Sequence, residues 1–260
     1  MTSTNTEFSG SRMKILRAEQ HINDLKTAVS DFREMPACTI AGKQDASTGQ
    51  TRIYIDSVQP IPEGVALCLE DAINNMRVAL DRAMFTLWKA NGCVGENPSI
   101  PTFRIFADAD EYATHRDGLK RLFGETVVKA LDAIKPYRTE YEVLWALNKL
   151  NNIAKHRQIP TLAARSPGLD LNDFFRAQTG IDRLPFSATS PVDMSGTMVP
   201  LEAGEVLKVF PMPLSAKAYE HIKVITHILI DEADIPASVS VEMFCEKAIG
   251  AVKWCIRQLE

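Results

Sequence analysis

Apolar residues recur along most of the chain with the period of one face of an α-helix. Between Ser11 and Met35 they return every three or four residues, with charged residues between them, and Pro36 ends the pattern. The same period predicts further helices, at about Glu63–Ala90, Ala107–Phe123, Glu125–Ile134, Tyr141–Arg157 and Val239–Leu259, with a short one at Leu171–Ala177. Residues 1–10 are small and polar, and are expected to form a disordered tail.

Shorter segments alternate apolar and polar residues or are rich in β-branched residues, as strands are. Cys38–Ala41 and Thr51–Val58 predict a hairpin, and further strands are expected at Gln158–Ala164, Glu205–Phe210 and His221–Ile230. Most of the segment from 166 to 200 shows no sustained period and predicts loop. The expected fold class is therefore α+β: a bundle of four to five helices, a small and mostly antiparallel sheet, and a C-terminal helix that docks back on the bundle.

These elements are expected to form one domain from residue 11 to residue 260. A change of composition near residue 158, where a helical part gives way to a strand-rich part, is a candidate internal boundary. The chain of 260 residues is long enough to bury a sizeable core.

Charge and cysteine usage narrow the class of protein. A net charge of −4 gives no global electrostatic case for nucleic-acid binding. Five cysteines form an odd set without a Cys-x-x-Cys pair, which is typical of reduced thiols in a cytoplasmic protein. The first residues lack the apolar stretch of a signal peptide, and no apolar run is long enough to span a membrane, so we expect neither secretion nor membrane insertion.

Motifs for metals and common cofactors are missing from the sequence. The five histidines show no zinc-type spacing with one another or with cysteines. There is no phosphate-binding loop, no dinucleotide-binding glycine pattern and no serine-hydrolase elbow. We therefore expect no metal and no cofactor.

Two of the predicted helices, 63–90 and 138–157, carry polar residues at helical spacing. On the first, Glu70, Asn74, Arg77 and Asp81 step by four, three and four. If a matching stripe on the second helix faced them, the candidate catalytic residues would be Arg77 and His156, since an arginine can hold an oxyanion and a histidine can act as acid or base near neutral pH. The candidate binding residues are Asn74, Asp81, Asn148, Asn152, Lys155 and Arg157.

A purely structural interpretation explains the same residues. Polar residues on one side of an amphipathic helix most often form a solvated face, and buried asparagines can tie down a turn. The cations Lys155, His156 and Arg157 lie at a helix C-terminus, where the helix dipole favours them without any function.

The run from Asp71 to Arg82 resembles an uncharacterised family of bacterial and phage proteins. In that family a long helix carries a pattern close to H-N-L-R-x-A-L-D-H-L, and a later helix ends in D-K-H-R, which Ala154–Arg157 partly matches. An R-A-x-x-H-I/L pattern near the N-terminus of the family is similar to Arg17–Ile22. The resemblance covers most of the chain through short motifs, and it implies no function.

The helix pattern is also similar to the R-x4-6-H motif of HEPN-type all-α ribonucleases. In those proteins two motifs meet across a homodimer and cleave RNA without a metal. Here Arg82 stands where a motif that starts at Arg77 asks for histidine, so the dyad would need His156 to complete it. The strands predicted after residue 157 are foreign to a plain HEPN bundle.

Two functions are compatible with these observations. One is a binding or interaction module with a polar site between helices 63–90 and 138–157. The alternative is a HEPN-like, metal-independent ribonuclease or toxin that uses Arg77 and His156, and RNA is an expected partner only in that case.

Overall fold

A computed structural model shows an α+β protein, as the sequence predicts, and describes residues 8–92, 101–156, 160–179, 189–191, 198–235 and 239–260. The chain divides into two compact units. We call residues Met1–Thr27, Gly64–Pro160 and Val241–Glu260 the helical unit, and residues Ala28–Glu63 and Thr161–Ser240 the sheet unit. The candidate boundary near residue 158 lies close to the division between Pro160 and Thr161. The sheet unit additionally includes the early hairpin.

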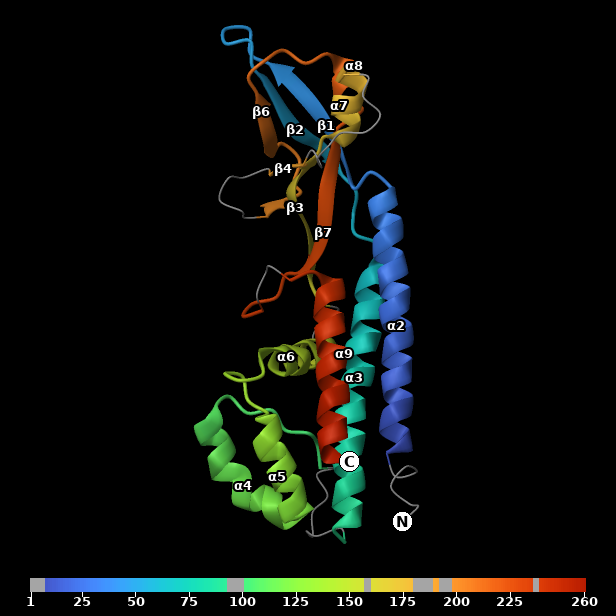
Figure 1. Cartoon of the computed structure of the whole chain (residues 1–260), viewed down its shortest axis with the longest axis vertical. Helices are drawn as coiled ribbons and strands as arrows, with labels where there is room; N and C mark the ends of the chain where they lie inside the picture. Colours follow the sequence, from blue (N-terminus) through green and yellow to red (C-terminus); the bar gives the residue numbers. More distant parts are fainter. Residues whose placement is uncertain (1–7, 93–100, 157–159, 180–188, 192–197, 236–238) are drawn as a thin grey trace. The chain divides into compact units, whose positions relative to one another are not determined.

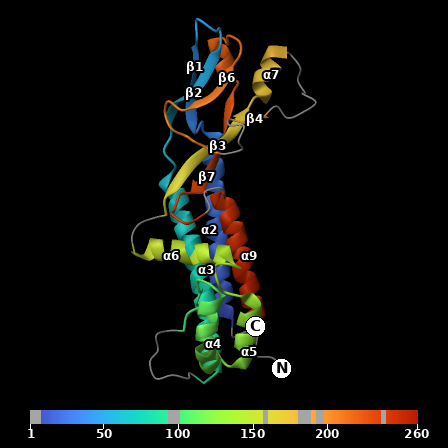
Figure 2. The same cartoon turned by 90° about the vertical axis from the view of Figure 1, so that its left-hand side faces the viewer.

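Three long helices form the centre of the helical unit: α2 (Ser9–Glu34), α3 (Glu63–Ala90) and α9 (Val241–Leu259). The last residues of α2, from Ala28 on, belong to the sheet unit. The three helices lie side by side in both views (Figures 1 and 2). The buried positions of α2 in the helical unit alternate by four and three residues: Ser11, Ile15, Ala18, Ile22 and Leu25. That seven-residue repeat is the packing pattern of coiled coils, and it explains why the sequence period located these helices well.

Shorter helices complete the helical unit. They are α4 (Ala109–Phe123), α5 (Glu125–Ile134) and α6 (Glu142–His156). Figure 2 shows α6 running across the long helices. It packs on α9, and the ring of Tyr141, the residue before α6, stacks on Trp254 of α9 with centroids 5.9 Å apart. The predicted docking of the C-terminal helix on the bundle is confirmed.

Charged residues on α2 and α9 form a ladder of three ion pairs. Arg12 pairs with Glu260 at 2.9 Å, Glu19 pairs with Lys253, and Lys26 pairs with Glu246 at 2.7 Å. The partners advance by seven residues on α2 and retreat by seven on α9, so the two helices run antiparallel with one constant register. All six side chains are partly exposed, so each pair contributes little to stability, about 0.2–1 kcal/mol.

Reversing one charge of this ladder is expected to cost a small but measurable amount of stability. Glu19→Lys should lower the free energy of unfolding by about 1 kcal/mol, because an attraction is lost and Lys253 gains a like-charged neighbour. The double variant Glu19→Lys with Lys253→Glu should regain most of that loss. Urea unfolding followed by helical circular dichroism measures both changes. A double variant as unstable as the single one would show that the pair does not interact in solution.

The strands of the sheet unit form two antiparallel sheets. One has the order β1-β2-β6, made of Cys38–Gln44, Thr51–Val58 and Val206–Phe210. The other has β3 (Leu162–Asp170) at its centre, with β7 (Lys223–Ile230) on one side and the short β4 (Thr189–Pro191) and β5 (Val199–Pro200) on the other. The antiparallel pairing and the early hairpin were predicted correctly, but the strands divide between two sheets.

The core of the sheet unit draws on both sheets and on two short helices, α7 (Asn172–Thr179) and α8 (Ala216–Tyr219). Ile55 and Leu207 from the first sheet, Leu169 from the second and Phe174 from α7 belong to one apolar cluster. On β1, Gly42 makes room for Tyr219 of α8, because a Cβ at this glycine would lie 2.2 Å from the tyrosine Cζ.

The prediction of mostly loop between residues 166 and 200 was wrong for β3, which continues to Asp170, and for β4 and β5. The strand is interrupted by an irregular register between Arg165 and Gly168. There the Ser166 hydroxyl donates to the Gly168 carbonyl at 2.9 Å and accepts from the Gly168 N–H at 3.2 Å. Serine, proline and glycine at such a bulge hide the strand from a propensity argument.

Candidate functional site

Helix α3 is enclosed on more than one side, which decides the surroundings of Arg77. Asn75, Met76 and Arg77 are consecutive and all buried. Successive residues of a helix point about 100° apart, so these three positions cover more than half of its circumference. The polar stripe predicted on this helix therefore is not one solvated face: Asn74 is exposed, Asp81 is partly buried and Arg77 is buried.

Arg77 and Asp81 form an ion pair inside the helical unit. The Arg77 Nη2 lies 3.0 Å from the Asp81 Oδ1, and their side chains are 8% and 23% exposed. The same Asp81 oxygen accepts a hydrogen bond of 2.9 Å from the backbone N–H of Phe103, which is fully buried. Burial lowers the pKa of the Arg77 guanidinium, and the charge of Asp81 acts in the opposite direction.

Part of the Arg77 guanidinium has no partner. Its Nη1 is buried and makes no hydrogen bond to any residue that the structure describes. A buried donor without an acceptor costs free energy, about 1–3 kcal/mol, so native proteins rarely leave one without a reason.

On α6 the structure brings a different asparagine inside from those singled out in the sequence. Asn148 is half-buried, and Asn152 and Lys155 are exposed. Asn151 is only 2% exposed, and its Oδ1 is buried without a hydrogen-bond partner among the described residues. The side chain of His156 and the whole of Arg157 lie outside the described residues, so the meeting of Arg77 with His156 stays a prediction.

Asn75 is the second buried asparagine that the sequence argument missed. Its Oδ1 accepts from Lys14 Nζ at 2.9 Å and its Nδ2 donates to the Asp71 carbonyl at 2.8 Å, so it links α2 to α3. The sequence contains a signal for the burial of Asn75, because this residue lies three positions after Ala72 and four before Ala79. That spacing puts it on the same face of the helix as the two alanines, which are both buried. Asn151 likewise lies four residues after the buried Leu147.

A second polar cluster joins α4 to α5. Arg116 binds Asp132 through two hydrogen bonds of 3.1 and 2.7 Å, and the Tyr112 hydroxyl donates to the same carboxylate at 2.8 Å. The hydrogen bond from Arg116 is the main reason why the pKa of Asp132 is lowered, and burial is the main reason why the pKa of Tyr112 is raised. Every group in this cluster has a partner, which is typical of a structural clasp.

Other classes of site find no support in the described part of the chain. It contains no group of three or more potential metal ligands, and none of its helices is long and apolar enough to cross a membrane. Arg82, which occupies the histidine position of the HEPN-type motif, is exposed. Comparisons of the chain with protein-family models, with curated proteins and with solved structures find no match.

Proposed function

We propose that the protein is a binding module that recognises an oxyanion, either a carboxylate or a phosphate group, through Arg77. The observation that carries this proposal is the Arg77 Nη1, which is buried and has no acceptor among the described residues. Asp81 occupies Nη2, so one terminal nitrogen of the guanidinium is paired and the other has no acceptor among the described residues. Arginine binds carboxylates and phosphates through such a planar pair of donors.

Asn151 supports a polar ligand in the same unit. Its buried Oδ1 needs a donor in the same way that the Arg77 Nη1 needs an acceptor. A ligand that carries both an oxyanion and an N–H or O–H group would satisfy both helices at once. In this proposal the site lies between α3 and α6, the two helices that the sequence argument singled out.

One observation favours binding over the ribonuclease alternative. Arg82 stands at the motif position that requires a general acid or base, and an arginine keeps its proton at neutral pH.

Phosphate and acetate are the probes that test this proposal. At constant ionic strength, one of them should raise the thermal midpoint of the helical unit, by about 4 °C at ten times its dissociation constant. Arg77→Lys should lose most of this rise, because an ammonium keeps the charge opposite Asp81 but lacks the second planar donor. Helical circular dichroism measures the midpoints.

Arg82→Lys is the matched control, because Arg82 is an exposed arginine on the same helix and its replacement should leave the rise unchanged. An equal rise in wild type and Arg77→Lys, or no rise with either anion, would refute the proposal. If wild type instead cleaved mixed RNAs and Arg77→Lys did not, the ribonuclease alternative would be favoured.

A further inference from the structure

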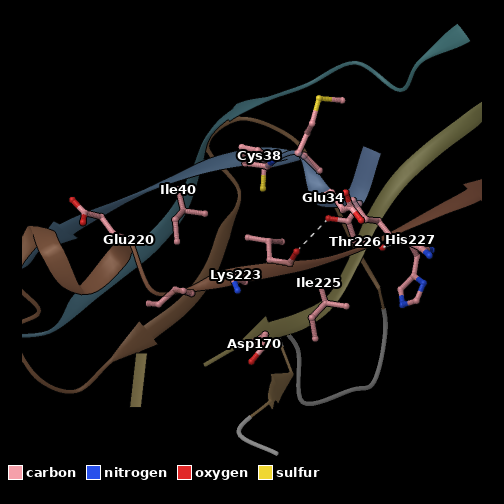
Figure 3. A pocket seen from close by; sticks show the side chains of 15 residues that line it. Glu34, Cys38, Ile40, Asp170, Glu220, Lys223, Ile225, Thr226 and His227 are labelled. Carbon is pink, nitrogen blue, oxygen red and sulfur yellow. Dashed lines mark hydrogen bonds between the residues drawn. The ribbon is translucent and has the colours of Figure 1, made fainter. Parts of the chain in front are cut away.

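The sheet unit contains a pocket of about 580 Å³, which is within the size range of small-molecule sites (Figure 3). It is lined by the end of α2 at Arg33 and Glu34, by Cys38 and Ile40 of β1, and by the first residues of β7. None of these residues belongs to the Arg77 site, so the pocket is independent of the function proposed above.

Two strand edges border this pocket. Among the described strands, β1 pairs only with β2 and β7 pairs only with β3, so each lies at the edge of its sheet. The successive residues Ile222–His227 all line the pocket, and because neighbouring side chains of a strand point to opposite faces, the edge of β7 itself must face it. An edge presents both backbone N–H donors and backbone carbonyl acceptors.

Apolar side chains form part of the wall. Cys38 and Ile40 point from β1 toward β7 (Figure 3). Cys38 is buried, and burial raises the pKa of its thiol, so this residue is a neutral, weakly polar wall rather than an anionic nucleophile. This part of the pocket suits a hydrocarbon body.

The positively charged groups of the pocket already have acceptors. Arg33 donates from Nε to the Thr226 carbonyl at 3.1 Å. Lys223 Nζ lies 2.6 Å from the carboxylate of Asp173, which is not part of the pocket wall. A carboxylate outside the pocket wall therefore neutralises Lys223, and one donor of Arg33 is engaged by the backbone.

The carboxylates of the pocket are less engaged. Glu34 and Glu220 lie at opposite ends of it in Figure 3, and neither accepts a hydrogen bond or forms an ion pair with a residue that the structure describes. Asp170 adds a third carboxylate, one oxygen of which accepts two hydrogen bonds from Asn172. The C-terminal end of α2 adds the partial negative charge of its last carbonyls. The pocket wall thus carries three carboxylates against one arginine and one lysine, beside an apolar surface.

We propose that this pocket binds an organic cation, in which a primary ammonium or guanidinium group is carried on a short apolar body. The cationic group would lie at Glu34 or Glu220 and donate to carboxylate or carbonyl oxygens. The apolar body would contact Cys38 and Ile40. The proposal concerns ligand recognition alone and requires no chemical step.

Three probes with one hydrocarbon body and different head groups test the proposal: hexylamine, hexanol and hexanoate at neutral pH. Titration followed by amide NMR shifts should show hexylamine binding with shifts in β1 and β7, and about fivefold more tightly than hexanol, with hexanoate weakest. Equal or tighter binding of hexanoate would overturn the proposal, as would binding that shifts no amide of β1 or β7.

Variants of residues that line the pocket distinguish an effect of the pocket carboxylates from an effect of the net charge of the protein. Glu34→Gln with Glu220→Gln should reduce hexylamine affinity about fivefold and leave hexanol affinity unchanged. Glu202→Gln removes another exposed carboxylate of the same unit, one outside the pocket, and should change neither affinity. Ile40→Trp, which fills the pocket, should weaken both probes. A loss of hexylamine binding in Glu202→Gln equal to that in the pocket variant would assign the effect to net charge and refute the site.

Discussion

Asp81→Ala is expected to lower the free energy of unfolding of the helical unit by about 3 kcal/mol, because it leaves the buried Arg77 charge without a counter-ion. The Phe103 N–H loses its acceptor in the same variant. Urea unfolding followed by helical circular dichroism gives the change. A loss below about 1 kcal/mol would mean that water or a mobile side chain replaces the carboxylate.

Two further variants show whether the loss is specific. Asp71→Ala removes a carboxylate from the same helix, but this one is 58% exposed and lies 3.7 Å from His21, so its loss should cost less than about 0.5 kcal/mol. Adding Arg77→Met to Asp81→Ala removes the unpaired charge, and it should recover part of the lost stability. A double variant less stable than Asp81→Ala would show that Arg77 stabilises the unit through packing of its stem.

Ile55→Ala and Leu80→Ala are each expected to cost about 2–5 kcal/mol, and each loss should be confined to its own compact unit. Ile55 lies in β2 and Leu80 in α3, and both are fully buried, so each truncation removes apolar contacts and leaves a cavity. Native-state hydrogen exchange resolves the effect by element. Ile55→Ala should speed exchange in β1, β2 and β6, and Leu80→Ala should speed it in α3, α6 and α9.

The two variants act as controls for each other, because both remove a similar apolar side chain from a fully buried position. If either variant accelerated exchange equally in β2 and α9, the two units would unfold as one cooperative body. That result would favour the single domain expected from the sequence over the division into two compact units.

The period of apolar residues located most of the long helices and strands, because burial of one face sets that period in each of them. Helices α3 and α5 and strand β2 begin and end where the sequence predicts, since each buries one continuous apolar face or alternates in and out of a core. The tetrapeptide helix α8 and the strands β4 and β5 were missed. Elements of two to four residues contain too few positions to show a period, and tertiary contacts fix their conformation.

The surroundings of the candidate site residues are harder to predict from the sequence than the fold is. A stripe of polar residues at helical spacing cannot distinguish a solvated face from a buried one, and Asn74 and Arg77 have opposite surroundings although they are three residues apart. Burial of Arg77 depends on α3 being covered on more than one side, which is a property of tertiary packing. The unpaired atoms of Arg77 and Asn151 depend on atomic positions, which no residue pattern encodes.

The charge ladder between α2 and α9 also determines which alternative alignments of these helices are excluded. Its signs alternate along each helix: Arg12, Glu19 and Lys26 face Glu260, Lys253 and Glu246. Sliding α9 by one heptad would preserve the apolar seam but bring Arg12 opposite Lys253 and Glu19 opposite Glu246, and a slide in the other direction would oppose Glu19 to Glu260. Three weak surface pairs therefore discriminate between registers that the apolar residues alone would tolerate.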